Sequence, residues 1–274
     1  DAVNSTGGLI IPSLLEKMGV ECIKLFCNPN GDFPHNPEPL PENLSEISKL
    51  VISEQADFGI VVDPDVDRLA FICEDGSMFG EEYTIVTIAD YILSKTPGST
   101  VSNLSSTRAL RDITNKYKCS YESSSVGEVN VVEKMKESNA VIGGEGNGGV
   151  IYPELHYGRD ALVGIALFLT QLAERKISVK KIRDSYPTYF MSKNKMELTS
   201  EVDIEDIFTR LVERYKNEKI TTIDGLKIDF KDSWVHLRRS NTEPIIRIYS
   251  ESRIDEADAI AEKMIKEIKE LIYE

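Results

Sequence analysis

The chain has few cysteines, no long apolar run and no excess of positive charge, and each shortage excludes a class of protein. Its 4 cysteines are too sparse for a disulfide framework and show no C-x-x-C spacing, which suits a reducing compartment. No apolar stretch approaches the ~20 residues of a membrane span, and the first residues do not resemble a signal peptide. We therefore expect a cytoplasmic protein that does not bind a membrane.

The charge balance is acidic, with 46 Asp and Glu against 32 Lys and Arg. Nonspecific binding to nucleic acid needs clustered basic side chains, so we do not expect a nucleic-acid partner. The 274 residues, 41% hydrophobic and 28% charged, are ordinary globular material with room for two or three cores. Any phosphate that the chain binds should therefore belong to a small molecule.

The most informative stretch is an apolar run, residues 58–62, followed by carboxylates at alternate positions, Asp63, Asp65 and Asp67. Such a run predicts a buried strand, and ligands gather at the carboxyl ends of strands in α/β sheets. Three carboxylates this close need a cation or a proton between them, and hard oxygen ligands suit Mg²⁺. Arg68 follows directly and can donate to a phosphate beside the metal. The alternative is a solvated acidic turn.

A second candidate loop, residues 143–149, contains five glycines. Glycine lets the backbone approach a ligand closely, and Glu145 and Asn147 are the only side chains there that can hold one. A hydroxyl-rich ligand suits these two residues. The alternative is a flexible linker.

A third candidate loop joins the last two predicted strands, and Arg247 follows it in the second of these strands. Hydroxyls, an amide, turn N–H groups and flanking guanidiniums make an anion site, although an ordinary hairpin turn is the alternative. The segment is Arg238-Arg239-Ser240-Asn241-Thr242-Glu243-Pro244.

The order of predicted elements gives the domain organisation. Strands and helices alternate up to Pro187, with a break at residues 96–99, and we expect strands at residues 20–26 and 140–142 among them. After Pro187 the pattern predicts a helix, four strands and a closing helix, which is an α+β arrangement. The sequence therefore predicts three domains: residues 1–97, 98–188 and 189–274.

These three loops, taken together and in order, resemble the α-D-phosphohexomutase family of phosphoglucomutase, phosphomannomutase and phosphoglucosamine mutase. The segment from Asp63 to Arg68 resembles the family's D-G-D-x-D-R metal loop, with Pro64 where glycine is usual. The glycine-rich loop resembles G-E-x-S-G-H, with Asn147 in place of serine and Gly149 in place of histidine. The third loop resembles the R-x-S-G/N-T phosphate loop, so the resemblance covers nearly the whole chain.

The resemblance implies two consecutive α/β sandwich units followed by a smaller α+β domain. It also implies reversible phosphoryl transfer between O1 and O6 of a hexose through a bisphosphate. Asp63, Asp65 and Asp67 would hold Mg²⁺ with a phosphoserine, and Arg68 would steady that phosphate. Glu145 and Asn147 would bind sugar hydroxyls. The residues expected to grip the phosphate that is not reacting are Arg238, Ser240, Asn241, Thr242 and Arg247.

The family's catalytic serine lies in a T-x-S-H-N segment of its first domain, and this sequence contains no such segment. We therefore expect domains two to four of a larger mutase, with a truncated first strand and the N-terminal domain of the same protein as partner. The chain alone should be inactive.

The departures from the family pattern bear on the substrate. Asn147 offers an amide instead of a hydroxyl, and Gly149 removes a side chain, which predicts a roomier pocket and favours glucosamine phosphate over glucose or mannose phosphate.

Two other functions remain open. The first motif also resembles the start of haloacid-dehalogenase-like phosphatases, which would make Asp63 a nucleophile, and a non-catalytic sugar-phosphate binding module is the third hypothesis.

Overall fold

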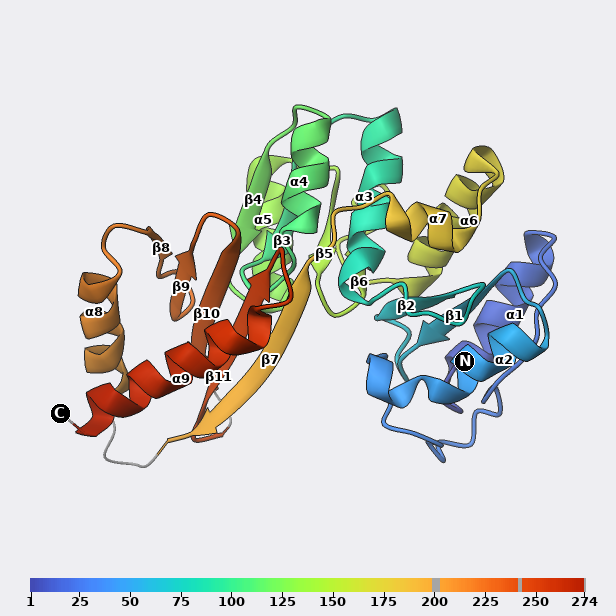
Figure 1. The fold of residues 1–274 in the computed structure, drawn as a ribbon. Coiled ribbons are helices and arrows are strands. Elements are labelled where there is room, and N and C mark those ends of the chain that lie inside the picture. The colour runs from blue at the N-terminus through green and yellow to red at the C-terminus, as the bar shows by residue number, and fades with distance from the viewer. Residues whose placement is uncertain (199–202, 241–242, 274) are drawn as a thin grey trace. The chain divides into compact units, whose positions relative to one another are not determined.

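The computed structural model describes residues 1–198, 203–240 and 243–273, and the chain forms two compact units, Asp1–Pro187 and Thr188–Glu274 (Figure 1). In these described ranges, no helix is both long enough and apolar enough to span a bilayer. The predicted α/β class, with a smaller C-terminal α+β part, is confirmed.

The first unit begins with two helices that cover a β-hairpin. The predicted strand at 58–62 is present, and its partner returns antiparallel, with Val62 opposite Leu69 at the innermost pair. Apolar residues of α2 and of both strands, among them Ile47 and Ile72, form a small core. The elements are α1 (Gly7–Lys17), a 3-10 turn η1 (Pro41–Asn43), α2 (Ser45–Ser53), β1 (Phe58–Val62) and β2 (Leu69–Cys73).

The rest of the first unit is a four-stranded sheet with helices. The strand order is β4-β3-β5-β6, parallel except for the last pair. Phe168 of α6 stacks on Phe71 of β2 with ring centroids 4.0 Å apart, which fixes the hairpin against this part of the unit. The elements are α3 (Glu82–Lys95), β3 (Thr100–Asn103), α4 (Ala109–Lys116), β4 (Tyr121–Ser124), α5 (Glu128–Ser138), β5 (Ile142–Glu145), β6 (Gly149–Ile151), α6 (Ala161–Arg175) and α7 (Val179–Asp184).

Two predicted strands of this unit are wrong in detail. Residues 20–26 form no strand, and Phe26 adopts a left-handed conformation (φ 49°). The strand expected at 140–142 is β5, which includes Gly143 and Gly144. A Cβ at Gly143 would lie 2.4 Å from the sulfur of Met135, and one at Gly144 would lie 2.1 Å from the carbonyl oxygen of Gly149. These glycines permit close packing, so the linker alternative is wrong.

The second unit is an antiparallel sheet in the order β7-β11-β10-β9-β8, with two helices on its apolar face. The long edge strand β7 was not predicted, because its sequence, FMSKNKME, is mostly polar and only one of its residues is buried. The elements are β7 (Phe190–Glu197), α8 (Ile204–Arg214), β8 (Lys219–Thr221), β9 (Leu226–Asp229), β10 (Ser233–Arg239), β11 (Ile245–Ser252) and α9 (Ala257–Tyr273).

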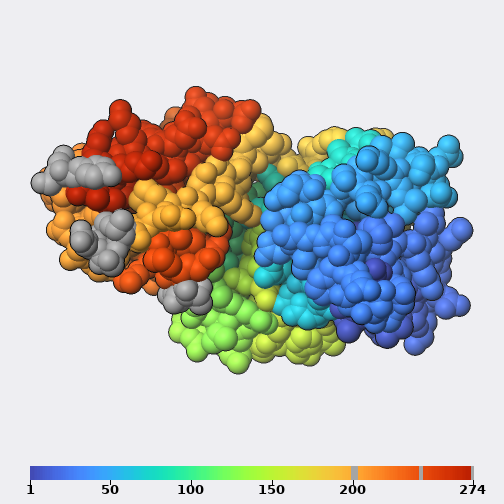
Figure 2. Space-filling model, turned by 90° about the horizontal axis from the view of Figure 1, so that it is seen from below, coloured from blue at the N-terminus to red at the C-terminus, as the bar shows by residue number. Residues whose placement is uncertain are grey.

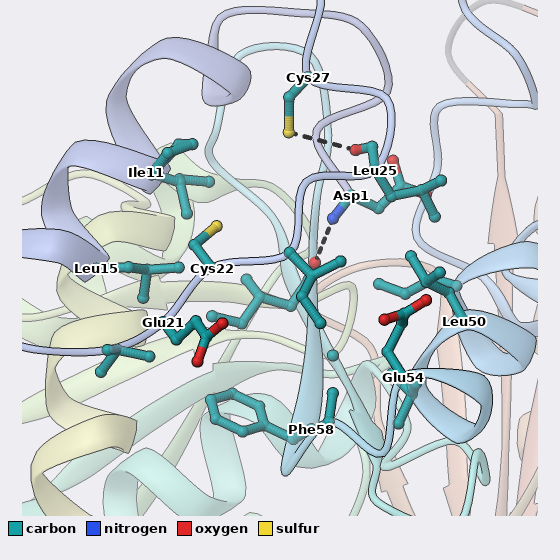
Figure 3. A pocket seen from close by; sticks show the side chains of 18 of the residues that line it. Asp1, Ile11, Leu15, Glu21, Cys22, Leu25, Cys27, Leu50, Glu54 and Phe58 are labelled. Carbon is teal, nitrogen blue, oxygen red and sulfur yellow. Dashed lines mark hydrogen bonds between the residues drawn. The ribbon is translucent and has the colours of Figure 1, made fainter.

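A cavity of about 400 Å³ lies between α1, α2, β1 and the segment of residues 20–27 (Figure 3). Apolar side chains such as Ile11, Leu15 and Leu25 line most of it. All residues that line it lie within residues 1–60, which are coloured in shades of blue in Figure 2. None of the three aspartates that follow β1 lines this cavity, so it is not the candidate active site.

His236 of β10 gives the second unit a pH-dependent stability. Its side chain is buried, and its Nε2 lies 2.7 Å from the carbonyl oxygen of Asp224. Burial lowers the pKa of His236 to about 4; Lys227 adds to this shift, and the Asp224 carbonyl opposes it. The unfolded chain therefore takes up the proton at higher pH than the folded chain. The resulting stability is full above the ordinary histidine pKa and is lost as the pH falls toward 4.

We expect the wild type to lose about 2 kcal/mol more unfolding free energy than His236→Gln when the pH is lowered from about 7 to about 5. Glutamine retains a donor for the Asp224 carbonyl but does not titrate. The single tryptophan, Trp234, lies buried in the same strand, so its fluorescence in urea titrations reports the unfolding. Equal losses in the two proteins would contradict the assignment to His236.

Candidate functional site

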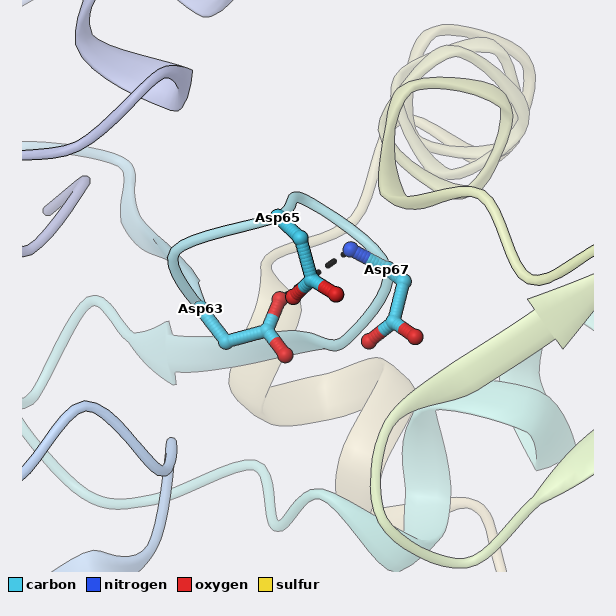
Figure 4. Close-up of side chains that lie close together, drawn as sticks. All are labelled: Asp63, Asp65 and Asp67. Carbon is cyan, nitrogen blue, oxygen red and sulfur yellow. Dashed lines mark hydrogen bonds between the residues drawn. The ribbon is translucent and has the colours of Figure 1, made fainter. Parts of the chain in front are cut away.

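The turn between β1 and β2 brings three carboxylates together. One ligand atom each of Asp63, Asp65 and Asp67 lies within 4.8 Å of the others, and Figure 4 shows the carboxylates gathered inside the loop. Val66 adopts a left-handed conformation (φ 62°), which turns the chain back toward β2. Asp65 is exposed, whereas Asp63 is only 6% exposed, so the segment is more than a solvated acidic turn.

The electrostatics of this cluster call for a cation. The pKa of Asp63 is raised to about 7, chiefly by burial and in part by Asp67 and Asp65, although the backbone N–H of Arg68 opposes the shift. Asp63 Oδ1 accepts from the N–H groups of Asp67 and Arg68, both at 3.0 Å. Within the described ranges, Asp67 Oδ1 is buried without a hydrogen-bond partner. This donor set of hard oxygens, one of them unsatisfied, fits a divalent cation such as Mg²⁺.

Arg68 lies beside the cluster. Its Nε is 3.6 Å from Asp63 Oδ2 and 3.8 Å from Asp67 Oδ1, and its Nη1 donates to Glu38 Oε1 at 3.1 Å. The Nε is itself buried and has no hydrogen-bond partner in the part of the chain that the structure describes. The guanidinium therefore offsets part of the negative charge and retains donor capacity for an anion.

The glycine-rich loop is joined to this hairpin. Leu69 N donates to the Gly148 carbonyl at 3.0 Å, and Arg68 and Gly149 form an antiparallel bridge. Glu145, at the end of β5, is therefore brought close to the metal cluster. Asn147 is half-buried, and its Oδ1 accepts from Gly149 N at 3.1 Å.

Glu145 is 3% exposed, and both of its carboxylate oxygens are engaged. Oε1 accepts from Asn103 Nδ2 at 2.7 Å and from Gly127 N at 3.1 Å. Oε2 accepts from Nη1 of Arg159 at 2.8 Å. The predicted sugar-binding carboxylate is thus held by protein donors in this structure.

Arg159 is the residue of this site that the sequence did not reveal. Its Nη2 donates to Asp67 Oδ2, so one guanidinium joins the metal loop to Glu145. Its backbone N–H donates to Glu128 Oε1 at 2.8 Å. Burial lowers the pKa of Arg159, but Asp67, Glu145 and Glu128 outweigh this effect and raise it overall.

Arg159 also bears on one expectation about the loop. A Cβ on Gly149 would lie 2.5 Å from Cδ of Arg159, so the arginine stem fills the space that a side chain at position 149 would take. The roomier sugar pocket stays a prediction. The available signal was the charged pair Arg159-Asp160 just before α6, where Asp160 caps the helix by accepting from Leu162 N and Val163 N.

The second unit carries a row of cationic side chains. Arg238 and Arg247 are directly opposite each other on β10 and β11, and Lys195 of β7 is opposite Arg247. Residues at these positions project from one face of the sheet. Like charges opposite each other destabilise a sheet unless an anion compensates them. The nearest carboxylates that pair with this row are Asp224, 3.4 Å from Arg238, and Glu243, 3.8 Å from Arg247.

The phosphate loop itself is only partly described. Ser240 is 7% exposed and donates its N–H to the carbonyl of Ile245 at 3.0 Å. The predicted residues Asn241 and Thr242 lie outside the described residues. Lys195 was missed because it lies on the unpredicted strand β7.

Comparison with protein families matches the chain in three parts. Residues 1–76 match the phosphoglucomutase/phosphomannomutase alpha/beta/alpha domain II, residues 80–189 match domain III, and residues 195–268 match the C-terminal domain. These matches do not support the phosphatase alternative for Asp63.

Curated relatives carry related names. The phosphoglucomutase/phosphomannomutase of Thermococcus kodakarensis is 36% identical over 93% of this chain and 57% of its own length. The phosphoglucosamine/phosphogalactosamine mutase of Sulfurisphaera tokodaii is 31% identical over 99% of this chain and 60% of its own. The chain therefore spans less than two thirds of these relatives.

Solved structures share the fold. A phosphoglucomutase/phosphomannomutase family protein of Burkholderia thailandensis matches all of this chain and 60% of its own, with a TM-score of 0.84 at 24% identity. Aspergillus fumigatus N-acetylphosphoglucosamine mutase, in complex with GlcNAc-6P and magnesium, matches 98% of this chain and 64% of its own, with a TM-score of 0.67 at 15% identity. Because the three domain matches together cover most of its length, the chain belongs to the phosphoglucomutase/phosphomannomutase family of phosphohexomutases.

Proposed function

We propose that this chain supplies the metal-, sugar- and phosphate-binding parts of a phosphohexomutase that interconverts hexose 1-phosphate and hexose 6-phosphate. The observation that carries the proposal is the convergence of three carboxylates at the end of β1, where a buried oxygen of Asp67 has no hydrogen-bond partner among the described residues. Phosphoryl transfer depends mainly on charge neutralisation and positioning, and this cluster provides both.

Asp63, Asp65 and Asp67 would hold Mg²⁺. When bound, the cation would neutralise charge on the phosphoryl group that is transferred. Arg68 would add donors to the same phosphate, because its buried Nε has no hydrogen-bond partner in the described ranges. Asp63 would be kept ionised by the cation and by the hydrogen bonds that it accepts from two backbone N–H groups.

The other two loops would hold the substrate. Glu145 and Asn147 would bind sugar hydroxyls, and Arg238, Ser240, Asn241, Thr242 and Arg247 would bind the phosphate that is not reacting. We add Lys195 to this phosphate site, since it lies opposite Arg247 on the same sheet face. A bisphosphate intermediate would turn over between two transfers, so that each end of the sugar is phosphorylated in turn.

The phosphorylated serine would come from a domain of the same protein that this sequence does not include. The chain has no T-x-S-H-N segment and spans about 60% of its curated relatives. We keep the division into residues 1–97, 98–188 and 189–274, and a cytoplasmic location, as part of this proposal. We also keep glucosamine phosphate as the preferred substrate, on the basis of Asn147 and the names of several relatives.

This chain alone should show no mutase turnover, whereas a longer protein that joins it to the serine-containing domain should convert glucosamine 1-phosphate. A coupled assay with Mg²⁺ and a trace of bisphosphate measures both, with glucose and mannose 1-phosphate as comparisons. Turnover by the chain alone would contradict the proposed division of the active site. A preference of the longer protein for glucose or mannose phosphate of about tenfold or more, or about 1.4 kcal/mol, would rule out the amino-sugar assignment.

Lys195→Ala should weaken the binding of hexose 6-phosphate to this chain by roughly 3- to 10-fold, since one exposed charge-assisted contact is lost. Isothermal titration calorimetry measures the affinity. Lys266→Ala on α9 removes the same charge from an exposed position and is the matched control. If the two variants bind equally well, Lys195 is not part of the phosphate site.

A further inference from the structure

Arg159 donates hydrogen bonds to carboxylates of two different proposed ligand sites, the metal site and the sugar site. Its Nη1 donates to Glu145 Oε2 at 2.8 Å, and its Nη2 donates to Asp67 Oδ2. The side chain is 15% exposed, and the two carboxylates are 4% and 18% exposed. A single guanidinium therefore links the glycine-rich loop to the metal loop at a nearly buried position.

The sugar side of this link is closed to ligand. Glu145 Oε1 already accepts from Asn103 and Gly127, and the almost completely buried carboxylate has Arg159 on its other oxygen. A sugar hydroxyl can therefore reach Glu145 only after Arg159 moves away from Oε2. Arg159 competes directly with a hydroxyl ligand.

On the metal side the competition is electrostatic. Arg159 binds Oδ2 of Asp67, while Oδ1 is buried, has no hydrogen-bond partner in the described part of the chain, and lies 3.8 Å from Arg68 Nε. A cation bound at Oδ1 places a second positive centre on the same carboxylate. The two positive charges repel each other across a partly buried site, which weakens the hold of Asp67 on Arg159.

The local sequence leaves room for this arrangement. Gly149 is a position where a Cβ would collide with the Arg159 stem at 2.5 Å, and its φ lies outside the left-handed region that requires glycine. The glycine is therefore needed for the arginine rather than for the backbone. Glu128, whose Oε2 lies 3.7 Å from Arg159 Nε, offers a carboxylate that can keep the displaced guanidinium nearby.

We infer that Arg159 is a positioning residue that couples the two sites. In the ligand-free state it holds both Asp67 and Glu145, and whichever ligand binds first, metal or sugar phosphate, releases it from both. The second ligand then binds without displacing it, so the two ligands bind cooperatively. This inference rests on the proposed function, because it takes Asp67 as a metal ligand and Glu145 as a sugar ligand.

The test is the affinity of this chain for hexose 1-phosphate with and without Mg²⁺, measured by calorimetry. In the wild type, Mg²⁺ should tighten sugar-phosphate binding by about fivefold or more, and the sugar phosphate should tighten Mg²⁺ binding by the same factor. In Arg159→Gln, each ligand alone should bind more tightly than in the wild type, and the coupling factor should fall to near 1. Arg159→Lys retains the charge without a fork that spans two acceptors, so the coupling should also be lost.

Two further variants serve as controls for the loss of coupling in Arg159→Gln. Arg111→Gln removes a partly exposed guanidinium elsewhere in the same unit and should keep the wild-type coupling, including any contribution from Mg²⁺ that binds the sugar phosphate in solution. Gly149→Ala displaces the Arg159 stem while leaving the guanidinium in the chain, and should reduce the coupling as Arg159→Gln does. It thus replaces Arg159→Gln if that variant does not fold.

The outcomes separate this inference from the proposed function. If the wild type binds both ligands but binds them independently, or if the coupling survives in Arg159→Gln and Gly149→Ala, the coupling role is wrong and the proposed function stands. If the wild type binds neither Mg²⁺ nor hexose phosphate, the proposed function fails and this inference fails with it.

Discussion

The mutual repulsion of Asp63, Asp65 and Asp67 is the constraint around which the first unit is built. The short turn between β1 and β2 forces their carboxylates to within 4.8 Å of one another. The chain offsets this repulsion with two backbone N–H groups on Asp63 and with Arg68 and Arg159. Burial, together with the neighbouring carboxylates, nevertheless raises the pKa of Asp63 to about 7. A bound divalent cation would satisfy the same charges more completely.

The glycine-rich loop holds the sugar-binding candidates rigidly beside this cluster. A Cβ at Gly146 would lie 1.9 Å from Glu82 Oε2, and Gly148 has a φ of +92° and lies against the backbone of Leu69. Both positions therefore need glycine, because a neighbouring element lies too close to the backbone for a side chain. This packing is the reason that Glu145 and the metal loop share one arginine.

Elements with a clear apolar periodicity could be predicted from the sequence, and the polar edge strand β7 could not. The hairpin strand at residues 58–62, the helix α6 and the helix α9 follow from periodicity, whereas β7 does not, because its polar residues carry no alternation. The three aspartates were visible because they are adjacent in sequence. Arg159 and Lys195 were not visible in this way. Arg159 pairs with Asp67, which is 92 positions away in the sequence, and Lys195 is placed opposite Arg247 only by the strand register of the folded sheet.

The most direct test of the account is to locate a cation in crystals of this chain soaked with Mn²⁺, which substitutes for Mg²⁺ at oxygen sites and gives an anomalous signal. We predict one strong peak at about 2.1–2.3 Å from one oxygen each of Asp63, Asp65 and Asp67. The peak should disappear in Asp65→Asn crystals and persist in Asp57→Asn crystals, since Asp57 is an exposed aspartate that precedes β1. A wild-type crystal without a peak at this cluster, or with its strongest peak elsewhere, would contradict the central claim that the three carboxylates form a metal site.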